Sequence, residues 1–355
     1  MRRLGVLHNG TFVYLSNKSP NENMALFGIS GVGKSTRINE IANDIVAVGE
    51  TVLCFDLDGT IVLDELQNYN FIDALEDGLN LRLLKQNDFE NEENYITFIS
   101  YITKIIAGTN HFGVRQIGAL REAIEYAFAH QNANETEMEA IARALILQDS
   151  SVATGVYHRL WSVLNCNVFR GSDKKIMQGK VNIISLKGID GETQRNVIEI
   201  MLGAIWKKYR LSKEKSWRMT VVVDEFQKLN LKKDSILTEM LREARKYGLS
   251  LVLATQSADI FNKDVLSAIH QTAVQMYFRL SSIDAKKIAE IIGSGNSEHY
   301  LLQLKNLKKG ESLVVGNVCV GGREILKPMV IRSRYEDRTK TTGGSFVVKR
   351  QICMK

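Results

Sequence analysis

The clearest chemical signal in the sequence is Gly28 to Thr36, which reads Gly-Ile-Ser-Gly-Val-Gly-Lys-Ser-Thr and fits Gly-x-x-x-x-Gly-Lys-Ser/Thr. Glycines at this spacing let successive backbone N–H groups curl around a phosphate chain. Lys34 can reach the β- and γ-phosphates, and the Ser35 hydroxyl can ligate Mg²⁺. The pattern predicts a P-loop that binds ATP with Mg²⁺; the alternative is a glycine-rich turn without a ligand. The residues expected to bind the nucleotide are Gly28, Ser30, Gly31, Val32, Gly33, Lys34, Ser35 and Thr36.

Two carboxylates, Asp224 and Glu225, follow the apolar run Met219–Val223 and give the Walker B form. Asp224 can hold Mg²⁺, directly or through water, and Glu225 can orient and deprotonate the attacking water. Together with the P-loop, the pair predicts ATP hydrolysis and not nucleotide binding alone. The alternative is a pair of surface carboxylates at the end of a strand.

A third apolar run, Ser250–Ala254, has polar residues on both sides. After it, the Gln256 amide can contact the γ-phosphate or the attacking water. Before it lie Arg242 and Arg245, and Arg279 follows a later apolar run. Oligomeric ATPases commonly use an arginine of the adjacent subunit to neutralise transition-state charge, an effect of roughly 10³–10⁵ in rate in other P-loop enzymes. Each arginine could instead be a cation at a helix C-terminus or a solvated surface charge.

Strands that alternate with helices must position these residues. Met24–Phe27 predicts a buried strand before the P-loop, and Thr36–Val48 has apolar residues at helical spacing. Further strands are expected at Thr51–Phe55, Val181–Ser185, Met219–Val223, Ser250–Ala254, Val274–Leu280, Glu311–Val315 and Glu324–Ile331, and further helices at Glu192–Tyr209, Asp234–Lys246 and Asp284–Ile292. This alternation predicts an α/β fold with a mostly parallel sheet and right-handed crossovers.

Residues 64–175 differ in character, because no strand pattern interrupts them. Helices are expected there at Leu79–Leu84, Tyr95–Ala107, Val114–Ala129, Thr136–Ile146 and Ala153–Leu164, with a polar loop at Asn87–Asn94. We therefore predict an all-helical insertion that divides an ATPase core into residues 24–63 and 176–335. Residues 1–23 predict a short hairpin around Asn9-Gly10. Ser212–Arg218 is expected to be a basic turn. The basic tail, residues 336–355, is expected to be mobile or to order on a neighbouring subunit.

The segment Asp56-Leu57-Asp58-Gly59-Thr60 also matches the nucleophile motif of the haloacid dehalogenase phosphatases, in which the first Asp is phosphorylated. In that fold the motif usually follows the first strand. Here it follows the second strand, after an intact P-loop. We therefore favour an acidic loop at the carboxyl end of a core strand, where ligand sites of α/β sheets lie.

Composition excludes several classes of protein. The 355 residues are 45% hydrophobic and 24% charged, which is ordinary for a soluble globular protein. No apolar run approaches the roughly 20 residues of a membrane helix, and no signal peptide is recognisable. The four cysteines form no CxxC pair, so a cytoplasmic location is expected and a zinc site is not. The net charge of +6 leans mildly toward nucleic acid or another anionic partner.

These residues together resemble the HerA/FtsK superfamily of hexameric motor ATPases, with HerA-type DNA translocases and VirB-type conjugation ATPases as the most similar branches. The resembling segments are Gly28–Thr36, Asp56–Gly59, Arg115-Gln116, Leu120–Ile124, Val221–Leu229, Arg242–Gly248 and Ala254–Ser257. The resemblance runs from about residue 24 to about residue 335. It implies a RecA-like core, a hexameric ring and ATP bound between subunits.

Two departures limit what the resemblance carries over. HerA proteins have an N-terminal β-barrel and VirB-type ATPases a large N-terminal domain, whereas only residues 1–23 precede the core here. Ring assembly or partner docking through such a domain is therefore not implied. In addition, the family usually shows Asp-Pro-x-Gly-Glu where this chain has Asp56–Thr60, so the catalytic help of that Glu is absent.

Three functions are consistent with the sequence. The first is a double-stranded DNA translocase or helicase that works with a nuclease or another effector in DNA processing, mobile-element transfer or phage defence. The second is a VirB-type secretion ATPase that acts on protein substrates with a membrane complex. The third is a platform that hydrolyses ATP slowly to control the assembly of a partner enzyme.

Overall fold

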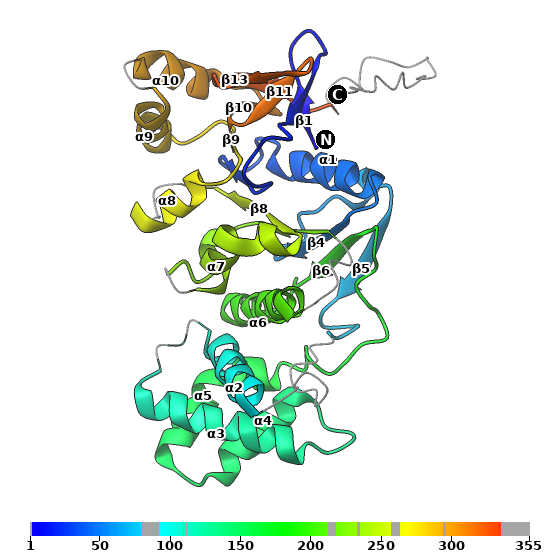
Figure 1. Cartoon of the computed structure of the whole chain (residues 1–355), viewed down its shortest axis with the longest axis vertical. Coiled ribbons are helices and arrows are strands. Elements are labelled where there is room, and N and C mark those ends of the chain that lie inside the picture. The colour runs from blue at the N-terminus through cyan, green and yellow to red at the C-terminus, as the bar shows by residue number, and fades with distance from the viewer. Residues whose placement is uncertain are drawn as a thin grey trace.

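One continuous sheet organises the chain in the computed structural model, which describes residues 2–79, 92–108, 110, 112–211, 218–232, 235–256, 263–293 and 296–334. Within these residues the sheet has 13 strands in the order β12-β11-β2-β1-β13-β10-β9-β3-β8-β7-β4-β6-β5. It runs through the molecule from the antiparallel strands beside α9 and α10 to β5 (Figure 1). The P-loop strand β3 pairs with β8 and β9, near the middle of this order.

The sheet has a parallel half and an antiparallel half. The parallel strands are β3 (Met24–Phe27), β4 (Thr51–Asp56), β5 (Tyr69–Asp73), β6 (Val181–Ser185), β7 (Met219–Val223), β8 (Leu249–Thr255) and β9 (Val274–Tyr277). The antiparallel pairs involve β1 (Arg3–Val6), β2 (Phe12–Leu15), β10 (Glu311–Gly316), β11 (Val318–Val320), β12 (Arg323–Ile325) and β13 (Met329–Arg332). The expected parallel sheet is thus one half of the structure, and the N-terminal hairpin belongs to the other half.

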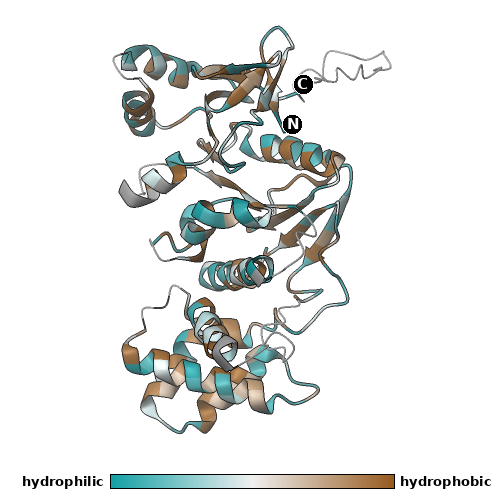
Figure 2. Ribbon diagram, viewed as in Figure 1, coloured by the Kyte–Doolittle hydropathy of each residue, from teal (hydrophilic) through white to brown (hydrophobic). Residues whose placement is uncertain are grey.

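Helices cover both faces of the parallel strands. They are α1 (Lys34–Ala47), α6 (Gly191–Leu211), α7 (Ile236–Glu243) and α8 (Lys263–His270), and α9 (Ser282–Ile292) and α10 (Ser297–Asn306) lie beside the antiparallel half. Alternate residues of β4 enter different cores, because successive side chains of a strand point to opposite faces. Val52 and Cys54 join the core that contains Ile41 of α1, whereas Leu53 and Phe55 join the core that contains Val197 and Leu202 of α6. Figure 2 shows the strands as mainly hydrophobic, with hydrophilic bands on the helices.

Four helices form a unit at one end of the molecule (Figure 1). They are α2 (Glu92–Ala107), α3 (Val114–His130), α4 (Glu137–Leu147) and α5 (Ser151–Asn165). Leu120, Ala123 and Ile124 of α3 are fully buried, as their helical spacing requires. Helices α2 and α5 contact α6, which joins the unit to the parallel sheet. These helices lie between β5 and β6 in sequence, and their buried apolar residues belong to the same hydrophobic core as α6 and one face of the sheet.

Several predicted elements need correction. Residues 64–175 are not free of strands, because β5 pairs in parallel with β6 at the edge of the sheet. The strand expected at Glu324–Ile331 is two strands, β12 and β13, which flank Pro328, a residue without a backbone N–H to donate. Helices α8 and α10 and strand β11 were not predicted from the sequence. The expected helix Leu79–Leu84, the turn Ser212–Arg218 and the tail 336–355 lie wholly or mostly outside the described residues. The last three residues of the expected loop, Glu92, Glu93 and Asn94, belong to α2.

Candidate nucleotide-binding site

The P-loop connects the buried strand β3 to the first turn of α1. Gly31 and Gly33 have φ angles of 75° and 104°, a region that favours glycine. Gly28 has no room for a side chain, since a Cβ there would lie 2.7 Å from Cβ of Phe278. Helix α1 begins at Lys34, so its unpaired N–H groups and positive dipole end face the loop. This loop is therefore shaped to receive an anion.

Lys34 is held inside the loop and is only 6% exposed. Its Nζ donates hydrogen bonds to the carbonyl oxygens of Gly28, at 2.6 Å, and Ile29, at 3.2 Å. Burial lowers the pKa of Lys34 from its ordinary value, and the nearby charges of Asp224 and Glu225 raise it in part. The ammonium group thus lies between the P-loop backbone and the two carboxylates that follow β7.

Asp224 and Glu225 follow β7 at the carboxyl edge of the sheet. Burial raises the pKa of Asp224, the negative charge of Glu225 raises it further, and Lys34 opposes both effects. Glu225 has φ 52° and ψ 41°, a left-handed conformation that is uncommon for a residue other than glycine. Its backbone N–H donates to Oδ1 of Asp224 at 3.0 Å. The turn directs two acidic side chains toward the P-loop.

The Glu225 carboxylate is held by two side-chain amides. Gln256 Nε2 donates to Oε1 of Glu225 at 2.5 Å, and Gln227 Nε2 donates to Oε2. Gln256 follows β8, the strand between β7 and β3, so it reaches Glu225 from the expected position. Gln227 was not predicted, because a glutamine two residues after a Walker B acid has no recognisable spacing signal.

A cavity of about 230 Å³ brings the predicted residues together. Its walls include Ser30, Gly31, Gly33, Lys34, Ser35, Thr36, Asp224, Glu225 and Gln256. Gly28 and Val32 shape the loop, but neither is among the described residues that line the cavity. The Ser35 hydroxyl and the Asp224 carboxylate offer hard oxygen ligands, which suit Mg²⁺ together with phosphate oxygens and water. Four further lining residues, Leu57, Asp58, Thr60 and Lys309, were not among the predicted site residues.

Asp56 has a structural role that argues against the phosphatase alternative. Its carboxylate is 4% exposed and accepts the backbone N–H groups of Thr60, at 2.9 Å, and Ile61, at 3.4 Å. A carboxylate used in this way folds the loop and does not line the cavity. Asp58 does line it, and one of its oxygens lies 3.7 Å from Nζ of Lys228. The loop therefore forms part of the wall of this cavity.

The candidate arginines lie outside this cavity in the described part of the chain. Arg245 precedes β8 and Gln256 follows it, so the two residues lie at opposite ends of this strand. Arg245 also donates a hydrogen bond to the carbonyl of Pro20. Arg242, on α7, is exposed. Arg279 is exposed beside the P-loop, where its carbonyl accepts the N–H of Ile29 at 3.1 Å. None of the three lines the described cavity.

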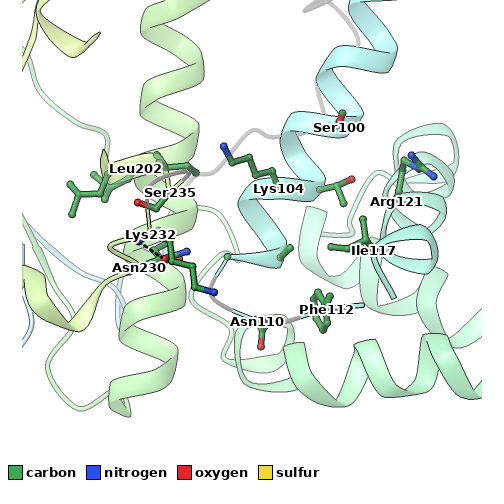
Figure 3. A pocket seen from close by; sticks show the side chains of 16 residues that line it. Ser100, Lys104, Asn110, Phe112, Ile117, Arg121, Leu202, Asn230, Lys232 and Ser235 are labelled. Atoms are coloured by element: carbon green, nitrogen blue, oxygen red, sulfur yellow. Dashed lines mark hydrogen bonds between the residues drawn. The ribbon is translucent and has the colours of Figure 1, made fainter. Parts of the chain in front are cut away.

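A second cavity of about 430 Å³ lies between the helical insertion and the core (Figure 3). Its walls come from α2, the α2–α3 connection, α3, α6, the segment after β7 and the start of α7, and they carry the cations Lys104, Arg121 and Lys232. Glu199 of α6 is 7% exposed and accepts the backbone N–H of Asn230 at 2.6 Å. Burial raises the pKa of Glu199 to about 7, against the opposing effects of this hydrogen bond and of Arg195.

Comparisons with known proteins agree with this architecture. The profile of the type IV secretion-system coupling protein DNA-binding domain matches residues 166–341. The DNA double-strand break repair helicase HerA of Saccharolobus solfataricus is 26% identical over 86% of this chain, and that of Sulfolobus acidocaldarius is 25% identical over 84%. These matches support placing the chain in the HerA/FtsK-type superfamily of P-loop motor ATPases. The chain spans 64% and 63% of the length of these two relatives.

Solved structures of other proteins share the RecA-like fold of this chain. VirB4 of Thermoanaerobacter pseudethanolicus superposes with a TM-score of 0.68 at 16% identity, covering 94% of this chain and 97% of VirB4. The conjugative coupling protein TrwB, without its first 70 residues, gives a TM-score of 0.64 at 15% identity and covers 94% of this chain and 89% of its own. Among the described residues, no helix is long and apolar enough to cross a membrane.

Proposed function

We propose that this chain hydrolyses ATP to drive the translocation of double-stranded DNA as part of a cytoplasmic ring. The proposal is carried by one observation: Lys34 and Ser35 of the P-loop line the same cavity as Asp224, Glu225 and Gln256. These residues come from the ends of β3, β7 and β8, three neighbouring parallel strands. The arrangement supplies a cation for phosphate, oxygen ligands for Mg²⁺ and a carboxylate for the attacking water.

Each residue then has a defined part in hydrolysis. Lys34 leaves the P-loop carbonyls and contacts the β- and γ-phosphates. Ser35 and Asp224 would hold Mg²⁺, which would neutralise phosphate charge. Glu225 orients the water and accepts its proton, and Gln256 fixes the Glu225 carboxylate and contacts the water or the γ-phosphate. Positioned bases of this kind contribute about 10²–10⁴-fold in rate.

A ring explains why the arginines lie away from their own cavity. We propose a hexamer in which Arg242 or Arg245 reaches the ATP of the adjacent subunit, with Arg279 as a third candidate. The exposed positions of Arg242 and Arg245 on α7 and the segment after it support this assignment. A hexamer would carry 6 × (+6) = +36 charges, and cations along its channel would bind DNA phosphates without reading sequence.

The relatives support DNA as the substrate. The proteins that match over most of this chain are described as DNA double-strand break repair helicases, and the matching profile is a DNA-binding domain. We propose that a separate nuclease or another effector acts with the motor in DNA-end processing, mobile-element transfer or phage defence.

A second candidate function is a conjugation or secretion ATPase. The match of residues 166–341 to a type IV secretion-system coupling domain favours it. Such a motor would act on protein or on a nucleoprotein substrate together with a membrane complex. Stimulation of ATP hydrolysis by that complex and by no DNA would support this candidate over the first.

Variants of the cavity test the proposal directly. We expect Lys34→Ala to abolish nucleotide binding or turnover, and Glu225→Gln to keep ATP binding while it abolishes turnover. Radiolabelled ATP binding and phosphate release by the purified full chain measure the two steps separately. Hydrolysis by Lys34→Ala at the wild-type rate would contradict the proposed nucleotide site.

A further inference from the structure

A turn from the antiparallel half of the sheet is packed directly on the P-loop. The Gly310 N–H donates to the carbonyl of Val32 at 2.8 Å. A Cβ on Gly33 would lie 3.1 Å from both N and Cα of Gly310, so the two backbones are already in close contact. The turn and the loop are separated by more than 270 positions in sequence, yet they form one surface.

The geometry of this turn is well defined. The Glu311 N–H donates to the carbonyl of Lys308 at 3.0 Å, and the Lys308 N–H donates to Oε2 of Glu311 at 2.9 Å. Gly310, the third residue of the turn, has φ 81°. These features describe a type II turn with Lys309 at its second position. Lys308 and Lys309 are therefore adjacent in sequence but occupy different positions of the turn.

Arg37 of α1 fixes the turn against the P-loop helix. Its side chain is completely buried, and it donates to the carbonyl of Gly310 at 3.3 Å and to the carbonyl of Leu4. The Ser333 N–H also donates to the Gly310 carbonyl, at 3.0 Å. The turn is thus connected to α1 and to the end of β13, and its position relative to the P-loop is set by the fold.

Lys309 is the residue that this turn brings into the nucleotide cavity. It lines the cavity together with Ser30, Lys34 and Asp224, whereas Lys308 does not. Its side chain is exposed, and it has no ion pair among the described residues. An exposed lysine beside a phosphate-binding loop is suited to bind phosphate as a point charge.

The charge of the cavity supports this role. Its walls carry three carboxylates, those of Asp58, Asp224 and Glu225, and the cations Lys34 and Lys309. A nucleoside triphosphate adds further negative charge. Mg²⁺ offsets part of it when bound, but without Lys309 the wall would supply a single ammonium group. Binding of the polyphosphate therefore benefits from a second cation.

We propose that Lys309 contacts the phosphate chain of the bound nucleotide from within the same subunit, as a second cation beside Lys34. The inference rests on the proposed binding of ATP in this cavity. Because the contact is made to bound nucleotide both before and during reaction, its loss weakens binding and changes kcat little. The antiparallel half of the sheet thereby contributes directly to the nucleotide site.

The test compares Lys309→Ala with Lys308→Ala, a matched control that removes the same charge one residue away. Fluorescent ATP and ADP analogues measure Kd on the purified full chain, and phosphate release measures KM and kcat. We expect Lys309→Ala to raise Kd and KM about tenfold, Lys308→Ala to stay within about twofold, and Lys309→Arg to recover most of the affinity. Unfolding temperatures without nucleotide should be unchanged in all three.

A Kd for Lys309→Ala within about twofold of wild type would overturn the inference, as would equal losses in Lys308→Ala and Lys309→Ala. Lys309→Gln replaces Lys309→Ala if the alanine variant does not fold. Failure of the wild-type chain to bind either analogue would overturn the proposed function itself. Binding by the wild-type chain is therefore measured before any variant is compared.

Discussion

Gln256 donates a hydrogen bond to the Glu225 carboxylate, and this contact joins the ends of β8 and β7 in the nucleotide cavity. The second amide, that of Gln227, occupies the other carboxylate oxygen. A base that must receive a proton from one particular water needs a fixed orientation, and two amides provide it. The two glutamines differ in one respect, because only Gln256 lines the described cavity.

This difference predicts the effect of replacing each glutamine. Gln256→Ala should lower kcat at least tenfold with little change in the Kd for ATP, because it removes both the orientation of Glu225 and a contact to the reacting groups. Gln227→Ala should lower kcat less. Single-turnover hydrolysis and equilibrium binding separate the two quantities. An unchanged kcat in Gln256→Ala would show that the contact has no part in hydrolysis.

The arginine assignment predicts complementation between subunits. Arg242→Ala and Arg245→Ala are made separately, and we expect at least one to lower ATP hydrolysis by about 10³-fold or more. Mixing that variant with Lys34→Ala subunits should restore activity, since an intact P-loop then receives an intact arginine from its neighbour. Lys246→Ala is the control, because Lys246 is exposed and pairs with Glu243 at 3.9 Å. An arginine variant that is inactive alone and in every mixture would not act in trans.

The buried Glu199 predicts a contribution to stability that falls as pH rises. Its pKa in the folded chain is about 7, against an ordinary value of 4.5, so between these values the folded state keeps a proton that the unfolded state releases. The contribution of Glu199 to the free energy of unfolding should therefore decrease from about pH 4.5 to pH 7, by up to about 3 kcal/mol, and then level off.

Glu199→Gln isolates this contribution. The amide oxygen can still accept the Asn230 N–H, while the buried charge is removed. We expect the variant to be more stable than wild type at pH 8 and to differ little at pH 4.5, as measured by urea unfolding. Glu192→Gln, at an exposed position of the same helix, should have the stability of wild type at both pH values. Parallel pH profiles for wild type and Glu199→Gln would contradict the assignment.

Much of the parallel half could be predicted from sequence, because its strands are short apolar runs and each ends in polar residues with recognisable chemistry. The predicted bounds of β3, β6 and β7 agree with the structure residue for residue. Strand β5 was missed because Tyr69–Asp73 contains polar residues and only Ile72 is buried, as suits an edge strand. The strand expected at Glu324–Ile331 was also wrong, because Pro328 separates β12 from β13.

The parts of the site that sequence did not reveal depend on long-range packing. Lys309 reaches the P-loop only because Gly310 contacts Val32 and Gly33, and no local pattern encodes that contact. Asp58 and Thr60 enter the wall because Asp56 folds its own loop through backbone hydrogen bonds. Motif spacing identified the groups that do chemistry, whereas these neighbours became visible only with the fold.

The rate of ATP hydrolysis with and without duplex DNA tests the central claim most directly. We predict that the purified wild-type protein hydrolyses ATP, that duplex DNA stimulates the rate several-fold, and that the stimulation falls as salt rises because phosphate contacts release counterions. Glu225→Gln should be inactive under every condition. Active hydrolysis that no DNA stimulates at any salt concentration would contradict the proposal of a DNA translocase.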